Sequence, residues 1–114
     1  MRPEDRVRIQ HLIDAATKAV AYGSDRRRSD LDDDELLRLG LTKLVEIVGE
    51  AAKHVSDEVR TAHPGVAWTA AARMRDRLIH HYFDINLDVL WQTVTEDLPL
   101  LLEALGDPDR RPDS

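Results

Sequence analysis

The sequence predicts an all-α fold, a bundle of four or five helices, and three observations lead to that prediction. Apolar residues recur at helical spacing over most of the 114 residues, and no alternating run indicates a strand. Aromatic residues make up only 4% of the chain, so Leu, Val, Ile and Ala must build the core. A chain of this length suits one domain. We expect a helical domain over residues 1–105 and a disordered tail over residues 106–114.

The first helix is expected to begin at Pro3 and to end at Gly23. Proline is favoured in the first turn of a helix, and Glu4 and Asp5 lie near the positive end of the helix dipole. Apolar residues then recur at helical spacing until the glycine. The polar connector that follows, residues 23–34, carries a basic triplet and an acidic run and is expected to be a solvated loop.

The second helix is expected to be the longest. Its apolar stripe runs from Leu37 to Val59 in steps of three and four, and Pro64–Gly65 ends it. Gly49 lies inside this helix, where glycine costs about 1 kcal/mol relative to alanine. We interpret it as a position where another helix approaches closely.

The third helix is expected to start near Trp68 and to continue through "RMRDRLIHHYF", Arg73–Phe83. Asp84 or Asn86 can cap a fourth helix, whose leucine-rich stripe continues to Gly106. Pro99 lies within that stripe. Because proline has no backbone donor, it should kink or restart the helix there.

Composition excludes several classes of function. The chain has no cysteine, which excludes disulfides, thiolate metal sites and a cysteine nucleophile. The charged N-terminus is unlike a signal peptide and no apolar run is long enough to cross a membrane, so we expect a cytoplasmic protein without a membrane partner. A net charge of -6 argues against non-specific nucleic-acid binding. Any nucleic-acid site must therefore be local.

One such local segment is Arg73–Phe83, where three arginines and one aspartate give a net charge of +2 with histidine neutral. If the segment is one helix, Arg75 and Tyr82 lie on nearly the same face. Asp76 and His80 are four residues apart, so the carboxylate could hold one tautomer of the imidazole. The segment therefore combines a cation for phosphate with a group that can carry protons near neutral pH.

The neighbouring side chains in this segment are interpreted as structural or solvent-facing. Arg77 and His81 form a second pair with the same spacing, and His81 is expected to face solvent beside Arg77. The adjacent histidines point about 100° apart on a helix and no third ligand is evident, so we expect no metal site. Trp68, Trp91 and Phe83 are interpreted as packing residues and not as platforms for base stacking.

The motif R-x4-H-x-Y, formed by Arg75, His80 and Tyr82, resembles that of HepT-like toxins in the HEPN superfamily. Three blocks resemble successive parts of the same family in the right order: "LVEIVGEAAKHVSDEVRTAHPGVAW", "MRDRLIHHYFDINLDVLWQTV" and "EDLPLLLEAL". The resemblance covers roughly residues 5–105. It implies an HEPN-type helical bundle that forms a two-fold homodimer.

The resemblance further implies a metal-independent endoribonuclease without a cofactor, the toxin of a type VII toxin–antitoxin pair. It makes Arg75 and His80 catalytic, with Asp76 supporting them, at a composite site in the dimer interface. The substrate would be RNA, whether tRNA or mRNA. The partner would be a minimal nucleotidyltransferase antitoxin (MntA-like) that neutralises the toxin by AMPylation of Tyr82.

Two other functions remain open at this point. The chain could be a non-catalytic HEPN module that serves as the binding subunit of a nucleotidyltransferase. It could also be an inert helical dimer whose histidine-rich segment is only surface. RNA cleavage by the isolated protein separates the ribonuclease toxin from the non-catalytic module. An adjacent gene for a minimal nucleotidyltransferase favours either of these over the inert dimer.

Overall fold

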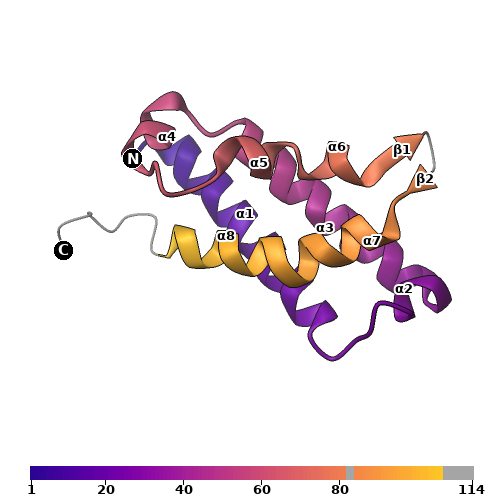
Figure 1. Cartoon of the computed structure of the whole chain (residues 1–114). Helices are drawn as coiled ribbons and strands as arrows, with labels where there is room; N and C mark the ends of the chain where they lie inside the picture. The colour runs from indigo at the N-terminus through magenta and orange to yellow at the C-terminus, as the bar shows by residue number, and fades with distance from the viewer. Residues whose placement is uncertain (82–83, 107–114) are drawn as a thin grey trace.

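The chain folds as a helical bundle with one short hairpin at its edge (Figure 1). The structure is a computed structural model that describes residues 1–81 and 84–106, with side chains for residues 1–79 and 84–106. The elements are, in order, α1 (Pro3–Gly23), α2 (Asp30–Asp33), α3 (Glu35–Lys53), α4 (Asp57–Ala62), α5 (Trp68–Ala72), α6 (Met74–Leu78), β1 (Ile79–His81), β2 (Asp84–Ile85), α7 (Leu87–Gln92), the π-helical turn η1 (Thr93–Asp97) and α8 (Leu98–Leu105). The all-α class is confirmed, and the expected tail over residues 106–114 lies, apart from Gly106, outside the described residues.

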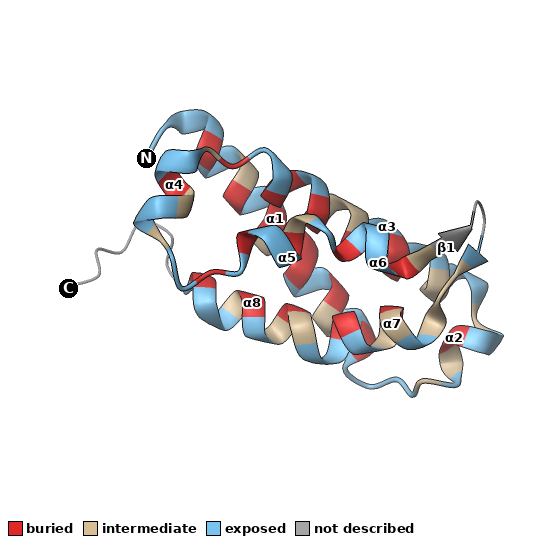
Figure 2. Ribbon diagram, turned by 45° about the horizontal axis from the view of Figure 1, so that its top comes forward, coloured by how far each residue is buried: buried red, intermediate tan, exposed pale blue. Residues whose placement is uncertain are grey.

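The bundle has a continuous apolar core between its long segments. Helices α1 and α3 pack against each other, and α7, η1 and α8 form one rod that packs against α1 (Figure 1). Helices α5 and α6 lie along α3. Buried residues line the inner side of each segment, as Figure 2 shows. The fully buried apolar side chains include Leu12, Leu31, Leu41, Val45, Val48, Leu78, Leu90, Val94 and Leu98.

The ends of α1 agree with the sequence, but the connector after it does not. Pro3 is the first residue of α1 and Gly23 the last. A Cβ on Gly23 would lie 2.9 Å from Val94 Cγ1, so this glycine permits close packing against the η1 turn. The acidic run, expected as solvated loop, instead forms α2, and its Leu31 is fully buried. The buried leucine anchors the connector to the bundle.

The expected second helix is two helices, so that prediction was wrong. Helix α3 ends at Lys53, and Ser56 begins α4 by accepting a hydrogen bond from Val59 N–H through its hydroxyl (3.3 Å). Val55 and Val59 are both buried, so the apolar spacing continues across the break. With 21 residues, α1 is longer than α3, which has 19.

The expected third helix is also wrong beyond Leu78. Helix α5 starts at Trp68 as predicted, a turn at Arg73 separates it from α6, and Ile79 has extended backbone angles (φ -99°, ψ 110°). From Ile79 the chain forms a hairpin, whose β1 and β2 pair antiparallel. Asn86 closes the hairpin, since its N–H donates to Leu78 C=O at 2.7 Å.

The last helical rod starts and breaks where the sequence indicates. Asn86, one of the two predicted caps, accepts a hydrogen bond from Val89 N–H (3.1 Å). The π-helical turn ends at Asp97, immediately before α8, whose first turn contains Pro99. The predicted interruption is therefore this wider turn. Gly106 ends α8 with φ 48°, in the left-handed region. No described helix is both long enough and apolar enough to cross a membrane.

The buried carboxylate of Asp5 connects the start of α1 to the break between α3 and α4 through hydrogen bonds. Asp5 is only 1% exposed, and it accepts hydrogen bonds from the Ser56 N–H (3.0 Å) and the Ser56 hydroxyl (2.8 Å). The backbone hydrogen bond from Ser56 is the largest cause that lowers the pKa of Asp5 below its ordinary value of 3.8. Asp5 thus fixes the residue that begins α4.

We expect Asp5→Asn to lower the free energy of unfolding at pH 7 by about 1–3 kcal/mol, because one Ser56 donor would then face an amide N–H₂. The ionised Asp5 stabilises the fold above pH ~4, and this contribution is lost as the pH falls through the lowered pKa. Denaturant unfolding at pH 7 and at pH 3 measures both effects. The difference between wild type and variant should shrink at pH 3, and the exposed Asp25→Asn serves as control. An equal difference at both pH values would contradict the proposed charge dependence.

Candidate functional site

The predicted site residues begin on α6, a five-residue helix that lies between α3 and α7. Helix α6 lies against α3 on one side and against α7 on the other. Its Arg75 points to α3, with Nε 3.7 Å from Glu46 Oε1. Its Arg77 points to the opposite rod, with Nη1 3.4 Å from Asp97 Oδ2. The two arginine side chains therefore lie on different sides of α6.

Arg75 is accessible and only loosely paired. Its side chain is 53% exposed, and its Nη1 also lies 3.6 Å from Asp76 Oδ1. Both distances exceed that of a hydrogen bond, so these are ion pairs in a solvated setting and are individually weak. The guanidinium is thus available for an anion, for which its planar fork is well suited.

Helix α3 presents two carboxylates on the side that faces Arg75. Glu46 pairs with it directly, and Glu50 lies one turn further on. The pKa of Glu50 is lowered, mainly by its hydrogen bond with His54 Nε2 (2.8 Å), and to a smaller extent by the charge of Arg75. The arginine is therefore set against an acidic edge of α3.

The net charge of +2 counted along Arg73–Phe83 is not the charge of the site. Glu46 and Asp97 come from distant parts of the sequence and stand beside the two arginines of α6. Sequence reasoning missed both residues, because nothing in their local sequence indicates which cation they face. The fold brings them there.

The histidine of the motif follows α6 on a different kind of element. His80 and His81 belong to β1, in which Ile79 pairs with Ile85 and His81 with Asp84. Because α6 ends at Leu78, the helical spacing that was expected to place Asp76 beside His80 is absent. The predicted shared face of Arg75 and Tyr82 falls on Tyr82, which lies outside the described residues. Local hydrogen bonding to the hairpin, and not continued helix, satisfies the backbone there.

The structure describes the side chains of some of the predicted site residues and not those of others. Asp76 is exposed and lies next to Arg75, and Arg77 pairs with Asp97. The side chains of His80 and His81, and all of Tyr82 and Phe83, lie outside the description. Trp68 is buried and donates its indole N–H to His63 C=O (3.1 Å), which confirms it as a packing residue. Trp91 packs partly buried against the core, as predicted.

Gly49 determines how closely this segment approaches α3. A Cβ at Gly49 would lie 3.4 Å from Ala72 C=O, 3.5 Å from Ala71 C=O and 3.8 Å from Arg75 N. Any larger side chain would press on the backbone at the junction of α5 and α6. The predicted close helix approach is confirmed, and it is what brings Arg75 to Glu46.

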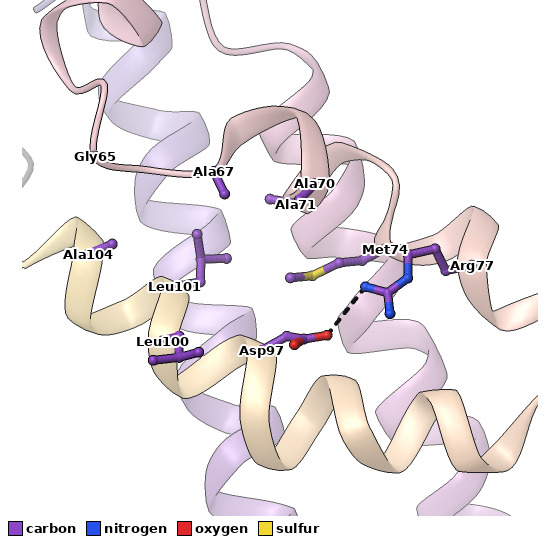
Figure 3. A pocket seen from close by; sticks show the side chains of 10 residues that line it. All are labelled: Gly65, Ala67, Ala70, Ala71, Met74, Arg77, Asp97, Leu100, Leu101 and Ala104. Atoms are coloured by element: carbon purple, nitrogen blue, oxygen red, sulfur yellow. Dashed lines mark hydrogen bonds and ion pairs between the residues drawn. The ribbon is translucent and has the colours of Figure 1, made fainter.

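A cavity of about 270 Å³ lies on the other flank of α6 (Figure 3). Its walls are mostly apolar, and the Arg77–Asp97 ion pair stands at one end. Small side chains from the plain "TAAA" run before Arg73 leave this space open. The lining residues are Gly65, Ala67, Ala70, Ala71, Met74, Arg77, Asp97, Leu100, Leu101 and Ala104. Among the described residues, no group of three or more His, Cys, Asp or Glu could hold a metal ion.

Comparisons with known proteins place the chain in a family. Residues 12–107 match the family described as "Ribonuclease HepT-like". A protein of Thermococcus cleftensis named "Probable ribonuclease HepT" is 36% identical over 98 residues, which cover 86% of this chain and 84% of that protein. A protein of Caldanaerobacter subterraneus named as a "Putative RNase" is 39% identical over 93 residues, with 82% and 83% covered. No solved structure matches the chain.

The fold and the matched residues define a helical domain of the ribonuclease type. This chain belongs to the HepT-like ribonuclease family. The resemblance read from the motif and the ordered sequence blocks is thereby confirmed.

Substituting Gly49 by Val should push the α5–α6 junction away from α3 and lower the free energy of unfolding by about 1–3 kcal/mol, as overpacking does. Gly40→Ala in the same helix is the matched control, since no atom lies within 4 Å of a Cβ there. That change should raise stability by about 0.5–1 kcal/mol through helix propensity. Denaturant unfolding measures both. Equal effects at the two glycines would show that Gly49 has no packing role.

Proposed function

We propose that this protein is a metal-independent endoribonuclease toxin of a HEPN/MNT toxin–antitoxin pair. The observation that carries the proposal is the exposed Arg75 on α6, directly before the hairpin that contains His80, in a chain of the HepT-like ribonuclease family. Arginine and histidine together can cleave a phosphodiester without a metal. The substrate class is RNA, because the chemistry uses the ribose 2′-hydroxyl.

Arg75 and His80 have distinct roles in this reaction. Arg75 binds the scissile phosphate and stabilises the charge that grows on it in the transition state. His80 transfers protons, either from the 2′-hydroxyl that attacks phosphorus or to the 5′-oxygen that leaves. Asp76, 3.6 Å from Arg75, supports the orientation of the guanidinium. A helix-held Asp76–His80 pair is not part of the mechanism, because α6 ends at Leu78.

The reaction needs an acid and a base, whereas the motif supplies one histidine per chain. A two-fold homodimer that places both copies of α6 and β1 at one cleft supplies the second histidine. We therefore propose a composite site in the dimer interface. The acidic remainder of a chain with net charge -6 makes such a pairing of arginines useful, since it concentrates the positive charge.

Control of the toxin is proposed to act at Tyr82. The cognate minimal nucleotidyltransferase antitoxin would attach AMP to its phenol oxygen. Tyr82 directly follows β1 in the sequence, so an added phosphate would be attached only two residues along the chain from His80. Its charge and bulk would block the entry of RNA.

One observation favours a second function, that of a non-catalytic binding subunit of a nucleotidyltransferase. Glu46 and Asp97 balance the charges of Arg75 and Arg77, which weakens attraction for RNA. A pure binding module needs no proton transfer. Cleavage of RNA by the purified protein distinguishes the two functions.

Arg75→Ala and His80→Ala should each lower kcat/KM for RNA cleavage by about 100-fold or more, because one removes the phosphate ligand and the other the proton carrier. Arg73→Ala and His11→Ala, the same residue types at exposed positions, are matched controls and should cleave like the wild type. Activity should persist in EDTA. Loss of cleavage on chelation, or full activity of His80→Ala, would refute the mechanism.

For the proposed homodimer, light scattering of the purified protein should give twice the 13.0 kDa mass of one chain.

Co-expression with the cognate nucleotidyltransferase should add whole AMP units to the wild-type chain and none to Tyr82→Phe. The physical reason is that phenylalanine lacks the nucleophilic oxygen but keeps the ring. Intact mass spectrometry measures the addition, and growth of the host reports toxicity. Tyr22→Phe is the control, because Tyr22 is an exposed tyrosine (55%) outside the motif. Equal mass gains in wild type and Tyr82→Phe would exclude Tyr82 as the modified residue.

A further inference from the structure

The arginine proposed to bind phosphate already has an anionic neighbour in the free protein. Glu46 Oε1 lies 3.7 Å from Arg75 Nε, and Glu46 Oε2 lies 3.9 Å from Lys43 Nζ. The glutamate side chain is 32% exposed and the arginine side chain 53%. The carboxylate is thus the more enclosed member of the pair, on the long helix α3, and the arginine the more accessible one.

An RNA phosphate that reaches Arg75 must compete with this carboxylate. Both carry negative charge and both bind the same guanidinium, so they would stand a few ångströms apart and repel each other. The existing ion pair is solvated and longer than a hydrogen bond, hence weak enough for a phosphate to displace. Glu50, one turn along α3, adds to the negative potential, and its lowered pKa includes a contribution from Arg75.

We propose that Glu46 is a specificity-determining residue of the RNA site: it occupies Arg75 in the free protein and sets a minimum affinity that an RNA must exceed. Because the Glu46–Arg75 pair must give way first, it reduces the affinity gained from that phosphate contact and favours RNAs that make further contacts. This inference rests on the proposed function for its substrate class. It adds that a glutamate distant in sequence restrains the arginine without taking part in the chemistry.

The test is Glu46→Gln, which keeps the size of the side chain and removes its charge. The KM for RNA should fall about three- to tenfold with kcat unchanged, because Arg75 becomes available without altering the transition state. The slope of log K against log[salt] for RNA binding should steepen by up to about 0.7, because the variant has no displaced carboxylate that takes up a cation when the phosphate binds Arg75.

Glu103→Gln is the matched control, since it makes the same change in net charge on α8. Glu103 is exposed and lies near the C-terminal end of α8, the end of the bundle away from the hairpin (Figure 1). At 0.1 M salt the Debye length is about 10 Å, so this control should leave both KM and the salt slope unchanged. An equal fall in KM for both variants would show a general charge effect and overturn the proposal.

A binding measurement separates this proposal from the proposed function. A DNA oligonucleotide of the same sequence lacks the 2′-hydroxyl nucleophile and reports affinity without cleavage. If the wild type cleaves no RNA, the ribonuclease proposal fails, while tighter DNA binding by Glu46→Gln still supports the competition at Arg75. If Glu46→Gln binds DNA like the wild type, or if it lowers kcat, Glu46 does not act as a competitor and the inference is overturned.

Discussion

The close approach of α5 to α3 at Gly49 is the packing constraint on which the candidate site depends. Because the glycine has no side chain, the last carbonyls of α5 lie 3.4–3.5 Å from where a Cβ would stand. That contact fixes the beginning of α6 against α3. Arg75 is the second residue of α6, so its guanidinium reaches the acidic side of α3. A Cβ at Gly49 would already be in van der Waals contact with these carbonyls, so the position leaves no room for a larger side chain beside the segment that carries Arg75.

The charge that surrounds the arginines of α6 is determined by residues of other helical segments more than by their neighbours in the sequence. Arg75 and Arg77 are two residues apart and belong to opposite flanks, one toward Glu46 and the other toward Asp97. Neither pair is buried, so each contributes little to folding stability. Their importance lies in what an incoming anion meets. A phosphate at Arg75 exchanges one partner for another and does not fill an empty site.

Among the described residues, three helices begin at a polar side chain that accepts a hydrogen bond from the first turn: Asp34 for α3, Ser56 for α4 and Asn86 for α7. Ser56 begins α4 and is itself fixed by the buried Asp5 of α1, and Asn86 begins α7 while its N–H closes the hairpin onto Leu78. At Ser56 apolar spacing alone had indicated continued helix, whereas Asn86 had been one of the two predicted caps. The hairpin that Asn86 closes onto Leu78 places His80 in a strand, where the sequence predicted helix.

The sequence alone determined the all-α class, the ends of α1, the start of α5, the break near Pro99 and the stop at Gly106. Each depends on local chemistry: the fixed φ of proline, the freedom of glycine and the period of apolar residues. The motif and the ordered blocks also identified the family. Only the tertiary structure decided that α6 stops at Leu78 and that Glu46 and Asp97 face its arginines. Apolar periodicity survives a break in the helix, because the next element buries its side chains in the same core. Ion pairs between distant helices depend on how those helices pack, which no local pattern encodes.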